Sequence, residues 1–368
     1  MNNDIMIKLG LEATSLCTPN RSGIANYTYN LVDSLLNESN FGNEFDLKLL
    51  YKLSRYKKRN YRYIPFENST QWHYKNILPL NKRFDIIHAA DNILIDWKKP
   101  KQIVTIYDLA IFKKENNMEG YTSAEFKEKS FKYLSNVAKR ADTIISISES
   151  TKKDFLELFD YKPENIIVTH LGLRLNNKPV ESKNVLTKLN IQPKKYFLFA
   201  GMISIRKNLV NLIKAYKESG LKDDFKLVLA GDASMGHDKI VSEIEKLNLQ
   251  QNVILSGFVS DEELAELYLN SKAFLFPTFY EGFGFPIIEA MSYGIPVLIG
   301  DRGAAPEVAG NHAVQVNPFE VDSISEGIKK VITVSETQIA AAKKHSEQFT
   351  WSRCARQTID VYKSVLGK

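Results

Sequence analysis

Short apolar runs alternate with amphipathic stretches along almost the whole chain. Runs rich in β-branched and aromatic residues, separated by helix-length segments, are typical of parallel strands buried on both faces. In the first half the predicted strands are Met6–Leu11, Phe45–Tyr51, Asp85–His88, Ile103–Ile106, Thr143–Ile147 and Ile166–His170. In the second half they are Tyr196–Phe199, Lys226–Leu229, Val253–Leu255, Ala273–Phe276, Val297–Ile299 and Ala313–Val316. Each set suffices for one doubly wound α/β sheet.

The polar stretch from Arg174 to Lys183 separates the two sets and has no apolar periodicity to bury, so we interpret it as an interdomain linker. The predicted domains are residues 1–173 and 184–349. A chain of 368 residues with 44% hydrophobic content is long enough for two cores. Near the end, Ala355 to Leu366 is predicted to form a helix capped by Thr350 or Ser352.

Two glutamates, Glu281 and Glu289, bracket a glycine-rich aromatic turn that leads into a predicted helix. Pro286 favours a helix start, and Gly294 favours its end. Glu281 on the loop can accept hydrogen bonds from sugar hydroxyls, and Glu289, expected in the first helical turn, can accept them from a ribose. Taken alone, the spacing also fits two exposed carboxylates in an ordinary strand–loop–helix unit.

The segment Glu281–Glu289 resembles the E-x7-E signature of family-4 retaining glycosyltransferases, which have the GT-B fold. Three further motifs resemble that family in the same order along the chain: Ser22–Tyr27, Ser204–Leu209 and Gly257–Leu264. The resemblance implies two Rossmann-like domains facing a central cleft, an acceptor-binding first domain and a nucleotide-sugar-binding second one. It also implies that residues 350–368 cross back to complete the first domain, and that neither metal nor cofactor is needed.

Arg206 and Lys207 follow a predicted strand, at the end of the sheet where open α/β folds bind ligands. We assign these cations, together with Glu281, to catalysis: they would stabilise the charge left on the outer phosphate when the sugar bond breaks. The same cations and both glutamates would bind the donor. The remaining expected donor contacts are Gly23, Phe258, Val259, Gly282, Phe283, Gly284 and Phe285.

The expected roles of these donor contacts differ. Gly23 would let the backbone approach the diphosphate, and Phe258 and Val259 would contact the base. Main-chain groups from Gly282 to Phe285 would contact the phosphates. Alternatively, Gly23 serves only the geometry of the turn, and Phe258 serves only packing.

The strand that ends at Tyr107 departs from the family pattern, because a histidine usually stands there, close to the reacting sugar carbon. A phenol can donate a hydrogen bond but is not a base near pH 7. Asp108 would orient the acceptor or cap a helix. His88 and Asp91, at and after the end of another strand, are also expected on the acceptor side.

Other nucleotide signatures are absent from the sequence. No G-x-G-x-x-G follows the first strand, and the glycines at Gly231 and Gly236 are followed by His237 and Asp238 in place of the Lys and Ser/Thr of a P-loop.

The activity that the family resemblance implies is hexosyl transfer to a surface glycan or lipid-linked acceptor. Tyr280–Pro286 and Arg302–Gly310 resemble mannosyltransferases, which implies GDP-mannose as donor. A UDP- or dTDP-sugar donor, a non-catalytic glycan-binding subunit and a sugar-nucleotide epimerase remain open.

The formal net charge of +6 is too mild to indicate nucleic acid binding. However, residues 48–63 mix seven cations with four tyrosines and contain no acid, which suits an anionic membrane surface or a solvated loop. The sequence has only two cysteines, and it shows neither a long apolar segment nor a basic leader. We therefore expect a cytoplasmic protein that is soluble or peripheral on the membrane's inner face.

Overall fold

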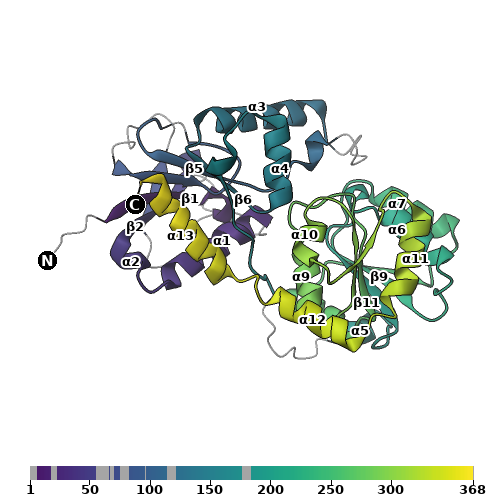
Figure 1. The fold of residues 1–368 in the computed structure, drawn as a ribbon. Helices are drawn as coiled ribbons and strands as arrows, with labels where there is room; N and C mark the ends of the chain where they lie inside the picture. Colours follow the sequence, from purple (N-terminus) through teal and green to yellow (C-terminus); the bar gives the residue numbers. More distant parts are fainter. Residues whose placement is uncertain are drawn as a thin grey trace. The chain divides into compact units, whose positions relative to one another are not determined.

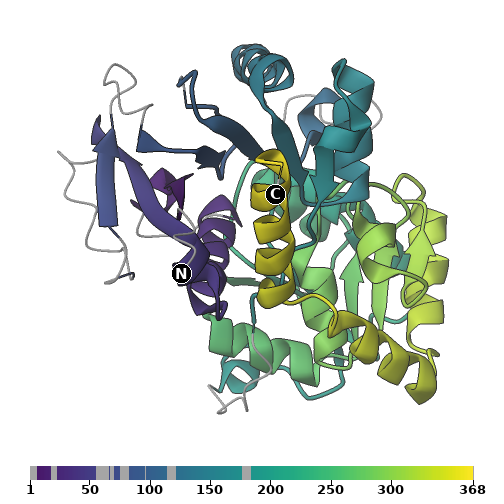
Figure 2. The same ribbon diagram turned by 60° about the vertical axis from the view of Figure 1, so that its left-hand side comes forward.

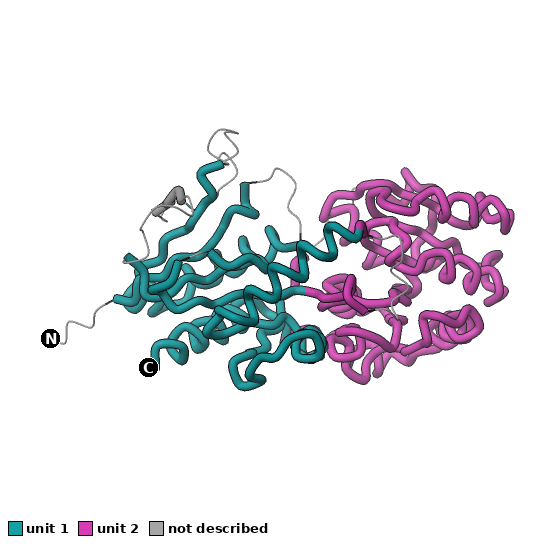
Figure 3. The backbone as a smooth tube through the Cα atoms, turned by 90° about the horizontal axis from the view of Figure 1, so that it is seen from above, with its two compact units in different colours: residues 1–107, 124–172, 349–368 teal, residues 108–123, 173–348 magenta. Residues whose placement is uncertain are grey.

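The computed structural model describes residues 6–17, 23–54, 66, 70–74, 83–95, 97–113, 122–175 and 184–367. The chain divides into two compact units (Figure 3). Unit 1 comprises Met1–Tyr107, Ala124–Gly172 and Phe349–Lys368, and unit 2 comprises Asp108–Ser123 and Leu173–Gln348. Each unit has its own sheet and its own core.

Among the described residues, the sheet of unit 1 has seven strands in the order β3-β2-β1-β4-β5-β6-β7. Every pairing in it is parallel. The strands are β1 Ile7–Glu12, β2 Phe45–Lys52, β3 Thr70–Tyr74, β4 Ile86–Ala89, β5 Lys101–Ile106, β6 Thr143–Ser146 and β7 Ile166–Val168. The chain order reverses direction between β1 and β4, which is the topological switch point of this sheet.

Helices cover both faces of the unit 1 sheet, with α1 and α13 on one side and α3 and α4 on the other (Figure 1). Figure 2 shows α13 lying alongside α1. The helical segments are η1 Thr14–Cys17, α1 Gly23–Asn37, α2 Phe41–Glu44, α3 Ala124–Arg140, α4 Glu149–Leu158, η7 Pro163–Asn165 and α13 Trp351–Val365. In α1 the buried residues Tyr27, Leu31, Val32 and Leu35 recur at helical spacing, so one face packs on the sheet.

The last helix, α13, packs closely against unit 1. Thr350 caps its first turn, because its hydroxyl oxygen accepts the N–H of Arg353 at 3.2 Å. A Cβ atom on Gly172 would lie 2.3 Å from the backbone nitrogen of Trp351, so only glycine permits this approach. The indole of Trp351 also contacts the ring of Tyr27, with centroids 6.1 Å apart. The predicted return of residues 350–368 to the first domain is thus confirmed.

In the part of unit 2 that the structure describes, the sheet has six parallel strands in the order β10-β9-β8-β11-β12-β13. The strands are β8 Tyr196–Ala200, β9 Lys226–Ala230, β10 Val253–Gly257, β11 Ala273–Phe276, β12 Val297–Gly300 and β13 Val314–Val316. Its topological switch point lies between β8 and β11. The loops that follow these two strands therefore begin side by side, at the edge where open sheets bind ligands.

Helices α6, α7 and α11 lie on one side of the unit 2 sheet, and α9 and α10 lie on the other (Figure 1). The helical segments are η5 Ala110–Phe112, α5 Val185–Lys188, η8 Ile205–Lys207, α6 Leu209–Glu218, α7 His237–Lys246, α8 Asp261–Asn270, α9 Phe285–Ser292, α10 Ala305–Ala309, α11 Val321–Val331 and α12 Glu336–Ser346. Helix α8 begins with a capping box, in which Ser260 and Glu263 each bind the other's backbone N–H. That box fixes where the loop after β10 ends.

All twelve predicted strands are present, with ends that agree to within two residues, so the doubly wound α/β fold is confirmed. Strand β3 was not predicted.

The domain boundary also differs from the predicted one, because Asp108–Ser123 groups with unit 2. The linker prediction is wrong at its start, since Arg174 forms ion pairs within unit 2 and Leu175 is buried. Residues 176–183 of that predicted linker lie outside the described residues.

Across the described ranges, no helix is both long enough and apolar enough to cross a membrane. Most of the basic, tyrosine-rich stretch 48–63 lies outside these ranges, from residue 55 onward. Its first part is the end of β2, where the Lys48 ammonium lies 2.6 Å from a carboxylate oxygen of Asp46.

Candidate active site

A buried ion pair joins the two loops at the switch point of unit 2. The Nζ atom of Lys207, on η8 after β8, donates a hydrogen bond to Oε1 of Glu281 at 2.7 Å. Lys207 and Glu281 are each 8% exposed. The ammonium also lies 5.2 Å from the ring centroid of Phe276, the last residue of β11. The sequence predicted both residues, and the structure brings them together across 74 positions of the chain.

Arg206 adds a second cation to this pair, with its Nη1 atom 3.9 Å from Oε2 of Glu281. Burial alone raises the pKa of Glu281, but the charges of Lys207 and Arg206 outweigh it and lower the pKa below the usual value. Burial lowers the pKa of Lys207, and the charge of Glu281 opposes that shift. Two cations therefore share one ionised carboxylate, an arrangement that can take up the negative charge of a phosphate.

The loop between Glu281 and α9 is packed into the unit. Gly284 has φ +99°, a left-handed conformation that favours glycine, and it is the N-cap of α9. The backbone oxygen of Glu281 accepts the N–H of Ala304 at 2.9 Å, which fixes the loop against the one that follows β12. Of the predicted donor contacts here, Gly282, Phe283 and Gly284 are buried and Phe285 is half-buried. The rings of Phe283 and Phe285 meet edge to face, with centroids 5.5 Å apart.

Glu289 lies in the second turn of α9, one turn later than predicted, and its carboxylate is already occupied. Its Oε1 atom accepts a hydrogen bond from Nε of Arg174 at 3.0 Å, and its Oε2 atom accepts one from the hydroxyl of Tyr268 at 3.2 Å. Burial raises the pKa of Glu289, against the opposing charge and hydrogen bonds of these partners. The expectation of an open carboxylate for a ribose is therefore corrected, since Glu289 is only 1% exposed.

Arg174 and Tyr268 are site residues that the sequence analysis missed. Arg174 stands in a polar stretch without periodicity, and Tyr268 has the apolar neighbours of an ordinary core residue of α8. Neither position carries a motif, and their partner Glu289 is 115 and 21 positions away, respectively. Only the folded arrangement reveals the contact.

The predicted base contacts Phe258 and Val259 follow β10. The Phe258 ring is 71% exposed, which leaves an apolar surface at the end of the sheet, whereas Val259 is half-buried. In unit 1, Gly23 is exposed at the start of α1, and a Cβ atom there would meet nothing within 4 Å. Sterics therefore do not require a glycine at this position. Ser22, the other half of the predicted turn, lies outside the described residues.

On the predicted acceptor side, the assignment of His88 is wrong. Its ring is completely buried, with Nδ1 2.7 Å from the Tyr362 hydroxyl and Nε2 2.8 Å from Oγ1 of Thr105. Burial lowers the pKa of His88 to about 3, so the imidazole is neutral at physiological pH. His88 is a core residue of unit 1, and its side chain has no exposed surface in this structure.

The other three predicted acceptor residues remain near the ends of their strands. The Tyr107 hydroxyl donates to the backbone oxygen of Ala90 at 2.5 Å, so its hydrogen is already engaged within unit 1. Asp91 is half-buried and accepts the N–H of Ile93 at 3.1 Å, while burial raises its pKa. Asp108 is exposed and accepts the N–H of Ala110 at 3.3 Å, but it is not the cap of η5, because Leu109 is the N-cap of that helix.

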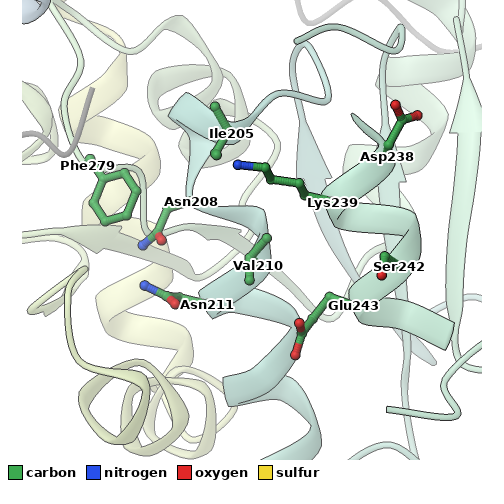
Figure 4. Close-up of a pocket in the computed structure, with 9 residues that line it drawn as sticks. All are labelled: Ile205, Asn208, Val210, Asn211, Asp238, Lys239, Ser242, Glu243 and Phe279. Carbon is green, nitrogen blue, oxygen red and sulfur yellow. The ribbon is translucent and has the colours of Figure 1, made fainter. Parts of the chain in front are cut away.

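A pocket of about 580 Å³ lies beside η8 in unit 2 (Figure 4). Figure 4 shows Lys239 of α7 pointing toward Ile205, with Asn208 and Phe279 along the opposite wall. Asn208 is buried and donates to the backbone oxygens of Pro277 and Pro318 at 2.8 and 2.6 Å, which ties the start of α6 to the neighbouring loops. The residues that line this pocket do not include the predicted site residues.

Two family models match the chain. The model described as Glycosyltransferase Family 4 matches residues 21–177, and the one described as Glycosyl transferases group 1 matches residues 182–348. The chain is 30% identical over 292 residues to O-antigen chain mannosyltransferase B of Escherichia coli, covering 76% of this chain and 74% of that protein.

Two solved structures show the same fold at low sequence identity. Sucrose-phosphate synthase from Thermosynechococcus elongatus aligns with a TM-score of 0.74 at 16% identity, covering 98% of this chain and 99% of that one. Anabaena HepE in complex with UDP and glucose aligns with a TM-score of 0.70 at 17% identity, covering 97% and 100%. These likenesses show the fold alone. The family models and the curated relative establish that this chain belongs to glycosyltransferase family 4, and the solved structures show that it has the GT-B fold.

Proposed function

We propose that this protein is a retaining hexosyltransferase that moves mannose from GDP-mannose to a surface-glycan or lipid-linked acceptor, at the inner face of the cytoplasmic membrane. The observation that carries the proposal is the buried Lys207–Glu281 ion pair with Arg206 beside it, at the switch point of the unit 2 sheet. The choice of mannose is supported by the relative that is named an O-antigen chain mannosyltransferase.

On the donor side, the bond between the sugar carbon C1 and the outer phosphate oxygen breaks, and that phosphate gains negative charge. Lys207 and Arg206 are the cations that would stabilise this charge. Hydrogen bonds to charged groups contribute roughly 1.5–3 kcal/mol each. Because Glu281 holds the Lys207 ammonium in one place, little reorganisation is needed as the charge develops. The second oxygen of Glu281 would accept a hydroxyl hydrogen of the sugar.

On the acceptor side, a hydroxyl oxygen bonds to C1 on the face that the phosphate leaves, and its proton passes to an oxygen of the leaving phosphate. No protein nucleophile or base is required by this route. The condition of two side chains that the sequence assigned to the acceptor side agrees with it, since His88 is buried and neutral and the Tyr107 hydroxyl is bonded to Ala90. We propose that the transfer needs neither a metal ion nor a cofactor.

Thermal-shift measurements with GDP, UDP and dTDP, each with and without EDTA, test the donor and the metal requirement. A ligand that binds only the native state raises the melting temperature. We expect a selective shift with GDP that survives EDTA, followed by transfer of labelled mannose to a lipid-linked acceptor. A Lys207→Ala variant should lose the shift, while Lys217→Ala, an exposed lysine of α6, should keep it.

A UDP-sugar donor is the second candidate, and it is favoured by the neighbour HepE, whose structure holds UDP and glucose. A selective shift with UDP would replace GDP-mannose by a uridine donor and leave hexosyl transfer intact. No shift with any of the three nucleotides would contradict the transferase and favour a glycan-binding subunit. Conversion of the donor without an acceptor would instead identify an epimerase.

A further inference from the structure

The pocket of about 580 Å³ beside η8 adjoins both loops that carry the Lys207–Glu281 ion pair. Its walls include Ile205, the first residue of η8, Asn208, just after η8, and Phe279, two residues before Glu281. The first two turns of α7 form another wall (Figure 4). Neither Lys207 nor Glu281 lines the pocket, so it is distinct from the proposed phosphate site. Its volume lies in the usual range for small-ligand pockets, about 300–1,000 Å³.

Two opposite charges on α7 line this pocket but do not pair with each other. Lys239 and Glu243 stand four residues apart, a spacing at which such side chains commonly form an ion pair on a helix. Neither side chain has an ion-pair or hydrogen-bond partner among the described residues. Figure 4 shows the Lys239 side chain extending toward Ile205 and the Glu243 carboxylate lying apart from it. A hydrogen-bond donor and an acceptor are thus both available to a ligand.

The carboxylate of Glu243 is the more telling of the two groups. Its Oε1 atom is buried and has no hydrogen-bond partner in the described part of the chain. Folded proteins pair nearly all of their buried polar atoms, because an unpaired one has lost its water without a replacement. A ligand that donates a hydrogen bond to this carboxylate would remove the deficit.

Two amide side chains at the start of α6 add further polar groups to the wall. The amide nitrogen of Asn208 donates to the backbone oxygens of Pro277 at 2.8 Å and of Pro318 at 2.6 Å. Because both partners are carbonyl oxygens, the amide oxygen is identified, and no described residue donates to it. Asn211 donates one hydrogen to the same Pro318 oxygen at 3.3 Å, and no described residue accepts its second one. The two amides therefore offer one acceptor and one donor.

Hydroxyl groups complement this wall better than a charged or an apolar ligand does. A hydroxyl both donates and accepts, so it can bind the Lys239 ammonium, the Glu243 carboxylate and the amides alike. An anion would meet two carboxylates, those of Asp238 and Glu243, beside one ammonium. An apolar ligand would leave all of these groups unpaired. The ring of Phe279 adds an apolar surface on which the C–H face of a sugar can pack.

We propose that this pocket is a saccharide-binding site of unit 2, separate from the phosphate site, and that it takes one or two hexose units of a glycan. The inference goes beyond the proposed function, since it adds a sugar site to the one where transfer occurs. A glycan bound here would stay close to the ion pair, because the lining residues Ile205, Asn208 and Phe279 are within two positions of Lys207 or Glu281 in the chain.

Saturation-transfer difference NMR tests the site, with methyl α-mannoside and an α-linked mannobiose as probes and the full-length protein. Both probes should receive saturation from the wild-type protein. Ser242→Trp places an indole in the pocket from an exposed position of α7, so this variant should lose the signal. Glu243→Ala removes the unpartnered acceptor and should raise the Kd about tenfold or more, the value of one hydrogen bond to a charged group.

Three controls separate this site from the donor site. Glu245→Ala, at an exposed position of α7 outside the pocket, is matched to Glu243→Ala and should bind the probes as the wild-type protein does. Lys207→Ala should keep the saccharide signal while it loses the nucleotide. The nucleotide that stabilises the wild-type protein should raise the melting temperature of Ser242→Trp equally, which shows that the blocked variant is folded.

Equal signals from the wild-type protein and Ser242→Trp would overturn the inference, because the sugar would then bind elsewhere. The absence of a wild-type signal would overturn it too, and a signal lost in Lys207→Ala would assign the sugar to the donor site. Binding of L-alanine but of neither saccharide would give the pocket to a zwitterion. A wild-type protein that binds the saccharides in this pocket but binds no nucleotide would refute the proposed function and leave this inference standing.

Discussion

The Nδ1 atom of His88 lies 2.7 Å from the hydroxyl oxygen of Tyr362, which joins strand β4 to helix α13 within unit 1. The other ring nitrogen lies 2.8 Å from Oγ1 of Thr105, which in turn lies 3.0 Å from the Tyr27 hydroxyl. Because a neutral imidazole donates through one nitrogen and accepts through the other, it can satisfy both neighbours. The last helix of the chain is thus tied to the sheet through a buried polar network.

Replacing His88 by glutamine is therefore predicted to reduce stability and to spare catalysis. Loss of a partner for the buried hydroxyls should lower the free energy of unfolding by about 1–3 kcal/mol. The value of kcat/KM should change by less than about tenfold, since no interaction of the transition state is removed. Urea denaturation and a transferase assay measure the two effects, and Tyr362→Phe should show a similar loss of stability. Normal stability with a large loss of activity would return His88 to the acceptor site.

Replacing Lys207 by alanine is predicted to have the opposite result. The variant loses a cation aimed at the outer phosphate and leaves Glu281 buried beside the more distant Arg206, so kcat/KM should fall by about 10²–10³-fold. Lys217→Ala, on the exposed face of α6, is the matched control and should retain activity. Circular dichroism checks that the fold survives. Full activity of Lys207→Ala would remove the ion pair from the proposed mechanism.

The fold was predictable from sequence largely because strands such as β4, β8 and β11 are buried on both faces, so that each is a local run of mostly apolar residues. Phe274–Phe276 is one such run, and its prediction required no knowledge of distant residues. Strand β3 was missed because Thr70–Tyr74 mixes polar and aromatic residues and has no continuous apolar run. Local pattern therefore specified the strands with a continuous apolar run, those at sheet edges included, better than the mixed strand β3.

The candidate site was predictable only in part, because its contacts join residues far apart in the chain. Lys207 and Glu281 each stand after a predicted strand, and parallel strand ends meet at one edge, so their proximity followed from the pattern. The same reasoning failed for His88, a strand-end polar residue whose partner Tyr362 is 274 positions away. It also failed for Arg174, which stands in a polar stretch that gives no sign of the carboxylates it meets in unit 2.

The basic stretch 48–63 is predicted to bind anionic membranes. Replacing Lys57, Lys58, Arg59 and Arg62 by serine removes four cations, each contributing roughly 1 kcal/mol near an anionic surface. Binding to vesicles with anionic lipid should fall by more than about tenfold, as measured by co-sedimentation at physiological salt. The matched control replaces four exposed lysines of α11 and α12, which are Lys329, Lys330, Lys343 and Lys344. Equal binding by both quadruple variants and the wild-type protein would reject a docking role for this stretch.

Glu12, at the end of β1, is predicted to make the stability of unit 1 depend on pH. Burial and then the charge of Asp91 raise its pKa from 4.5 to about 7, while Thr14 and Lys52 oppose the shift. A carboxyl whose pKa is higher in the folded state binds its proton more tightly there. Its contribution is therefore complete below pH 4.5 and is lost as the pH rises through about 7.

A shift of that size corresponds to about 3 kcal/mol over the interval. Glu12→Gln keeps one acceptor oxygen for Thr14 and removes the titration, so its stability should vary less with pH between 4.5 and 7 than that of the wild-type protein. Asp91→Asn should have a smaller effect in the same direction, because it removes only the second cause. Glu128→Gln, on the exposed side of α3, is the control and should follow the wild-type curve. Urea unfolding at a series of pH values gives these curves, and parallel curves for Glu12→Gln and the wild-type protein would show that folding does not raise the pKa of Glu12.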